Sequence, residues 1–115
     1  MPASLPDIVS DSKALNSKVF SLPRLLILSS LDELPERESA QYRELKGALG
    51  LGDGVLFANL KALLQMEYIQ EGEAKVEEGN MTVYSIAKEG KEELKRLREW
   101  FLKWINLGGE NEGHK

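Results

Sequence analysis

The 115-residue chain contains no cysteine and only one histidine, His114. Without cysteine, disulfide bonds, thiol catalysis and cysteine-ligated zinc sites are all excluded. Apolar runs reach only four residues, as at positions 25–28, whereas a membrane-spanning helix needs about 20. Residues 1–13 also lack the basic flank and apolar stretch of a signal peptide. We therefore expect a cytoplasmic protein that does not enter a membrane.

Side chains that could assemble a catalytic site are scarce as well. His114 lies in a terminal segment without apolar residues, and no Ser-His-Asp set or paired-carboxylate cleft can be put together. The glycine-rich segment GLGDG at 50–54 lacks the Gly-Lys-Ser/Thr ending and the preceding strand of a phosphate-binding loop. The sequence therefore predicts neither an enzyme nor a bound cofactor or metal ion.

Length and charge limit the remaining classes of protein. A chain of this size fits one domain, which we expect over residues 1–107, with a disordered tail at 108–115. The net charge is −4, and two segments, 32–38 and 71–79, each carry −3. The segment 41–66 carries +1 instead. Acidic charge disfavours nucleic-acid binding in general, but here it is concentrated in two predicted loops.

Hydrophobic spacing and turn residues predict a mostly helical α+β fold. Helices are expected at 10–20, 23–34, 43–49, 53–66 and 88–106, and a short strand at 39–42. The 53–66 helix carries an inward stripe of Leu56, Leu60 and Leu63. A strand beginning at 68–70 and a return strand at 81–86 would flank a hairpin tip at 72–80, with Gly79-Asn80 as the turn. A short helix, a glycine-rich turn, a second helix and a hairpin follow one another in this order.

Three segments form a recognisable set: SLPRLLILSSL at 21–31, YRELKGALGLGDGVLFANLKALLQMEYI at 42–69 and TVYSIAKEGKEEL at 82–94. Together they resemble winged-helix transcription regulators of the MarR/ArsR-like type, including small archaeal members. The resemblance covers about residues 15–100. It implies a winged helix-turn-helix with a two-stranded wing, terminal dimerisation helices and a 53–66 helix that enters the DNA major groove.

The outward positions of that helix are the predicted reading surface. We expect Gly54, Val55, Phe57, Ala58 and Lys61 to face the bases or the sugar-phosphate backbone. Val55 and Ala58 could contact thymine methyl groups, whereas Asn59 or Gln65 could read adenine if oriented outward. The alternative is that this apolar helix is covered by the chain's own core or by a protein partner.

Phosphate contacts are assigned to basic residues near this helix and on the wing. They are Arg43, Lys46 and Lys75. The wing departs from the family pattern because Glu73, Glu77 and Glu78 surround Lys75, and such carboxylates would weaken DNA binding.

The final helix carries a second pattern, an apolar seam at spacings of three, four and three. Its members are Leu94, Leu97, Phe101 and Trp104, with Ile105 beside them. Such an a/d-type seam favours a homodimer interface, and Leu15 and Val19 of the first helix would extend the surface. The alternative is that the seam packs against the chain's own core.

The sequence thus predicts a homodimeric winged-helix protein that binds double-stranded DNA, most simply a transcription regulator. The alternative is a winged-helix module that binds another protein through Val55, Phe57 and Ala58 and no longer binds DNA.

Overall fold

The computed structural model describes residues 4–107, whose contacts divide into two units. The larger unit comprises residues 18–91, and the smaller comprises the described residues 4–17 and 92–107. A continuous helix, α5 (Lys88–Asn106), begins in the larger unit and continues into the smaller one.

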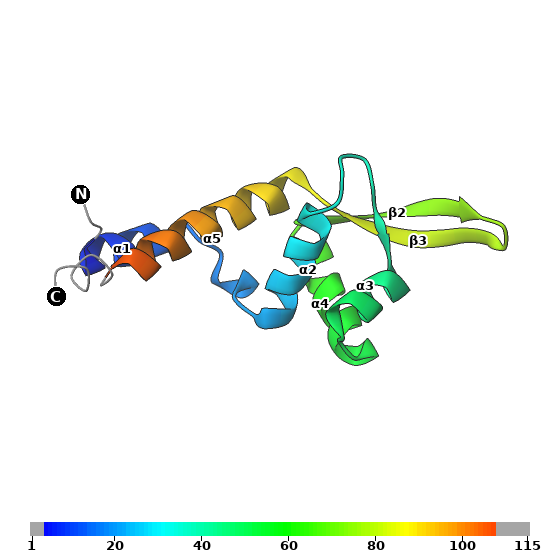
Figure 1. Cartoon of the computed structure of the whole chain (residues 1–115), viewed down its shortest axis with the longest axis horizontal. Helices are drawn as coiled ribbons and strands as arrows, with labels where there is room; N and C mark the ends of the chain where they lie inside the picture. The colour runs from blue at the N-terminus through cyan, green and yellow to red at the C-terminus, as the bar shows by residue number, and fades with distance from the viewer. Residues whose placement is uncertain (1–3, 108–115) are drawn as a thin grey trace. The chain divides into compact units, whose positions relative to one another are not determined.

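The larger unit has the predicted α+β fold. A 3₁₀ turn (Ser17–Val19) is followed by α2 (Leu22–Asp32), β1 (Ala40–Gln41), α3 (Tyr42–Leu49), α4 (Asp53–Gln65), β2 (Ile69–Val76) and β3 (Gly79–Ile86). The strands form an antiparallel sheet in the order β1-β3-β2. Figure 1 shows the β2–β3 hairpin projecting beyond α2, α3 and α4 as a wing. This arrangement confirms the predicted winged-helix fold.

Helix α2 forms where the sequence predicts it. Ser21 caps the N-terminus, with its hydroxyl accepting a hydrogen bond from the Arg24 backbone N–H at 3.3 Å, and Pro23 suits the first turn. Ile27, Leu28 and Leu31 are buried in the core. The apolar face therefore fixes α2 as a central support for the rest of the unit.

The α3–α4 pair forms the helix-turn-helix. Helix α3 ends at Gly50, whose φ of 64° is a left-handed conformation that glycine adopts without strain. After this turn the chain bends by 117° into α4. Leu56, Leu60 and Leu63 are buried as predicted, so the opposite side of α4 is available to solvent.

None of the described helices is long and apolar enough on its own to cross a membrane. Among them, only α3 and α4 taken together reach the necessary length and apolar composition, despite the 117° bend between them.

The wing is longer, and its turn tighter, than the sequence suggests. The predicted tip at 72–80 is wrong, because β2 runs to Val76 and β3 begins at Gly79. Val76 pairs with Gly79, so the turn consists of Glu77 and Glu78 rather than Gly79-Asn80. Gly79 has φ 125°, a conformation that glycine adopts readily, but it is the first residue of β3. The glycine therefore flanks the turn rather than forming it, which is why Gly79-Asn80 was a misleading turn signal.

The smaller unit contains α1 (Leu5–Ser12) and the later part of α5 (Figure 1). The helix predicted at 10–20 is therefore wrong: the helix begins earlier and has ended by Lys13. Ser4 and Asp7 form a reciprocal capping box, which starts the helix at Leu5. The predicted disordered tail at 108–115 lies outside the described residues.

Polar contacts help to hold this smaller unit together. The Trp100 indole N–H donates to the Ile8 carbonyl at 3.0 Å, and Lys103 Nζ forms an ion pair with Asp11 Oδ2 at 2.9 Å. Glu93 is only 2% exposed. Its carboxylate accepts hydrogen bonds from the Asn16 backbone N–H at 2.9 Å and from the Arg96 guanidinium at 2.7 Å. Burying Glu93 is tolerable because both carboxylate oxygens are paired.

Candidate nucleic-acid interface

The predicted reading positions of α4 all lie on its solvent-exposed side. Gly54, Val55, Phe57, Ala58 and Lys61 are exposed, with 47% exposure for Val55 and 61% for Phe57. Large apolar side chains on a helix are normally buried, so this exposure is informative. Within residues 18–91, the chain's own core does not cover this side of α4. A DNA-contacting role for these five residues stays a prediction.

The outward side of α4 has a central ridge between two flanks. Positions 54, 58, 61 and 65 recur at helical spacing opposite the buried leucines, so they form the ridge. Its N-terminal half carries the two smallest side chains, Gly54 and Ala58. Val55 lies on one flank and Phe57 on the other. A surface of this shape allows the helix backbone to approach another molecule closely.

The N-terminus of α4 is tied to α3. Asp53 Oδ1 lies 3.0 Å from Lys46 Nζ and accepts a hydrogen bond from the Tyr42 hydroxyl at 3.0 Å. The Asp53 carboxylate also lies at the positive end of the α4 dipole. These contacts hold the two helices of the helix-turn-helix at a set angle.

The same contacts shift two pKa values. Hydrogen bonds from Lys46 and Tyr42, together with the Lys46 charge, lower the pKa of Asp53 below its ordinary value of 3.8. Partial desolvation and the Asp53 acceptor raise the pKa of the Tyr42 hydroxyl above its ordinary value of 10.0. Asp53 is therefore ionised at neutral pH, and it partly offsets the positive charge that Lys46 was predicted to present to a phosphate.

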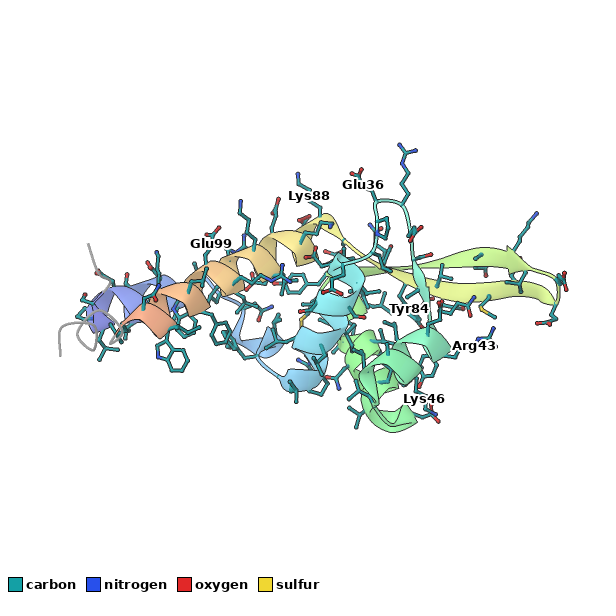
Figure 2. All side chains as sticks on the ribbon, viewed as in Figure 1. Glu36, Arg43, Lys46, Tyr84, Lys88 and Glu99 are labelled. Atoms are coloured by element: carbon teal, nitrogen blue, oxygen red, sulfur yellow. The ribbon has the colours of Figure 1, made fainter. Side chains whose placement is uncertain are left out.

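The other two predicted phosphate contacts are exposed. Arg43 projects from α3 (Figure 2), and its Nε–H donates to Gln41 Oε1 at 3.1 Å. Lys75 lies near the end of β2, opposite Asn80. Within residues 4–107, neither Arg43, Lys61 nor Lys75 forms an ion pair, so their charges are available to an anionic partner.

Asn59 is removed from the reading surface. Its side-chain oxygen accepts a hydrogen bond from Arg24 Nε–H at 2.9 Å, and its side-chain nitrogen donates to the Val55 carbonyl at 2.8 Å. The proposed adenine contact by Asn59 would require both bonds to break. Sequence reasoning missed this pairing because Arg24 is 35 residues away on α2.

The wing presents an acidic surface. Glu71 and Glu73 on β2 and Glu77 and Glu78 in the turn are all exposed. Burial, followed by the nearby Glu71 charge, raises the pKa of Tyr84 above 10.0. Carboxylates close to phosphates would oppose binding, so we expect α4 and α3 to contribute more than the wing.

Part of the predicted dimer seam is covered within the single chain. Val19, Leu94 and Leu97 are 0%, 3% and 1% exposed, so they contribute to the packing of that chain. Leu15 and Phe101 are half-buried. A dimer role for these five residues stays a prediction.

The exposed apolar residues of the smaller unit lie on α1 and in the last turns of α5. Trp104 and Ile105 remain exposed as predicted, and Leu102, Leu5 and Val9 join them. Trp100, which the predicted seam omitted, stacks on Trp104 with ring centroids 6.4 Å apart. The i, i+4 spacing of the two tryptophans was the available signal. An interface role for these residues stays a prediction.

Comparisons with known proteins agree with this geometry. The sequence profile of a family described as winged helix DNA-binding domain matches residues 24–105. No match was found among curated protein sequences.

Solved structures provide a second comparison. A PadR-family transcription regulator from Clostridium difficile is 22% identical, with TM-score 0.60, covering 74% of this chain and 94% of its own. A candidate transcriptional regulator from Salmonella typhimurium is 21% identical, with TM-score 0.61 and coverage of 87% and 85%. Another from Thermoplasma acidophilum is 26% identical, with TM-score 0.55 and coverage of 73% and 89%.

Proposed function

The chain belongs to the winged helix DNA-binding domain family, and we propose that it is a homodimeric, cytoplasmic transcription regulator that binds double-stranded DNA through α4. The regulators among its structural neighbours support the transcriptional role. The finer MarR/ArsR-like resemblance stays a prediction.

The observation that carries the proposal is the exposed outer side of α4, held by the Asp53 contacts to α3. A helix-turn-helix presents its second helix to the major groove, and its two helices commonly meet at about 90–120°. The 117° bend between α3 and α4 lies in this range. Three exposed cations, Arg43, Lys61 and Lys75, come from three elements of the same unit.

The proposed homodimer rests on the exposed apolar side chains of the smaller unit. Trp104 and Ile105 are 51% and 63% exposed, and such side chains gain stability when a second copy covers them. Two copies would place their α4 helices in successive major grooves, about 34 Å apart. Analytical ultracentrifugation should detect a dimer, and Trp104→Ala with Ile105→Ala should shift it towards monomer.

Fluorescence anisotropy with mixed-sequence duplexes tests DNA binding. Three phosphate contacts per subunit in a dimer give an expected slope of about −5 for log affinity against log salt. Arg43→Ala should reduce both the affinity and the steepness of this slope. Failure to bind any duplex at micromolar protein and low salt would contradict the proposal.

Lys88→Ala is the matched control for Arg43→Ala. Lys88 is an exposed cation at the start of α5, away from α3 in Figure 2. Both changes remove one positive charge, but only Arg43 neighbours the helix-turn-helix. Equal losses of affinity would show that net charge, rather than this surface, controls binding.

The exposure of Phe57 favours a second candidate, a protein-interaction module. In that case Val55, Phe57 and Ala58 would contact another protein, and the acidic wing would not need to approach phosphate. Phe57→Ala separates the two functions. Loss of a protein partner with unchanged DNA affinity would favour the interaction module.

A further inference from the structure

We infer that α4 discriminates DNA sequences chiefly through the C5-methyl groups of thymine, so that the preferred duplex places thymine where Val55, Phe57 and Ala58 meet the major groove. This inference rests on the proposed DNA-binding function and specifies its ligand. Thymine is the base that presents a methyl group in the major groove, and apolar side chains read it.

Few hydrogen-bonding side chains remain available on the outer side of α4. Bases are usually distinguished by paired hydrogen bonds from Arg, Lys, Asn or Gln. Both polar atoms of the Asn59 amide are bonded within the chain, to Arg24 and to the Val55 carbonyl. Only Lys61 and Gln65 remain on the ridge, in the later turns of α4.

The first turns of the α4 ridge carry little side-chain bulk. N-terminal residues of a recognition helix contact base edges, and in α4 these ridge positions are Gly54 and Ala58. A Cβ atom added to Gly54 would meet nothing within 4 Å, so packing inside the chain does not require glycine there. The absence of a side chain at Gly54, in the first turn of α4, lets the helix backbone approach a groove floor closely.

Both flanks of α4 carry exposed apolar side chains. A helix about 10–12 Å across fills a major groove about 12 Å wide, so both flanks meet its walls. Val55 and Phe57 occupy opposite flanks and are 47% and 61% exposed. Covering a thymine methyl with either side chain removes apolar surface from water on both molecules.

Two pairs of alternating copolymer duplexes isolate the methyl group without knowledge of the operator. Poly(dA-dT) differs from poly(dA-dU) by the methyl alone, and poly(dI-5-methyl-dC) differs from poly(dI-dC) in the same way. All four carry equal backbone charge, so the phosphate contribution is held constant within each pair. Affinities would be measured by competition anisotropy with the full chain.

The methylated duplex should bind more tightly in both pairs. One buried methyl group corresponds to about 4-fold in affinity, and one methyl in each half-site of a dimer to about 15-fold. Phe57→Ala and Val55→Thr should each reduce this ratio, and Val55→Thr does so with nearly unchanged side-chain shape. Arg43→Ala should weaken binding to all four duplexes while preserving the ratio.

The remaining outcomes overturn the inference in distinguishable ways. Equal, salt-dependent binding to all four duplexes would refute methyl reading and leave DNA binding intact. Tighter binding to poly(dI-dC) than to poly(dA-dT) would assign discrimination to Lys61 and the purine O6 and N7 acceptors instead. No binding to any duplex at low salt would refute the inference together with the proposed function.

Discussion

Gly90 provides the sharpest test of how the start of α5 packs. An alanine Cβ at this position would overlap the Tyr68 carbonyl oxygen, and it would lie 3.0 Å from Ile86 Cγ1. The Tyr68 carbonyl is backbone, so it cannot rotate away as a side chain would. It also accepts a hydrogen bond from the Ala87 N–H at 2.9 Å. Gly90→Ala must therefore displace the beginning of α5 from β2.

The expected magnitude follows from opposing contributions. Overpacking costs about 1–3 kcal/mol, and weakening the Ala87–Tyr68 hydrogen bond adds about 0.5–1.5 kcal/mol. Alanine's better helix propensity returns about 1 kcal/mol. We expect Gly90→Ala to lower the free energy of unfolding by about 0.5–3.5 kcal/mol, and a central value of about 2 kcal/mol corresponds to a fall in Tm of about 10 °C.

Gly47→Ala is the matched control. Gly47 lies inside α3, and a Cβ there would meet nothing within 4 Å. The same chemical change should therefore raise stability by about 0.5–1 kcal/mol. Urea and thermal unfolding, followed by circular dichroism, measure both variants. If Gly90→Ala is as stable as Gly47→Ala, the close packing against Tyr68 is not present in solution.

Three further predictions concern stability. The pKa of Asp53 is lowered in the folded state, so its pairing with Lys46 stabilises the fold above about pH 4, and this stabilisation is lost as the pH falls through the folded-state pKa. The Tm values of Asp53→Asn and wild type should therefore converge in acid. A constant difference in Tm between about pH 2 and pH 7 would contradict this. Glu67 has φ 63°, so Glu67→Gly should raise the free energy of unfolding by about 0.5–1 kcal/mol in urea titrations, and a loss of stability would contradict a left-handed helix end. Glu93→Ala leaves the Asn16 N–H without its acceptor and should cost about 1–3 kcal/mol by the same titration, whereas a neutral effect would show that Glu93 is solvated.

Local sequence signals determined most of the fold. Ser21 and Pro23 mark the start of α2, and the Leu56, Leu60 and Leu63 stripe identifies α4 and its buried side. These signals act within one or two helical turns, so the sequence displays them directly. The same kind of signal is present at Ser4 and Asp7, whose capping box starts the helix at Leu5, so the prediction of a helix at 10–20 is wrong.

The sequence by itself also determined which α4 positions face outward, because helical periodicity places Val55, Phe57 and Ala58 away from the leucine stripe. Only the tertiary structure decided which polar groups remain available there. Asn59 is bonded to Arg24 from another helix, and Lys46 is paired with Asp53 across the turn. Hydrogen bonds and ion pairs between distant segments depend on three-dimensional packing, which periodicity along one helix does not encode.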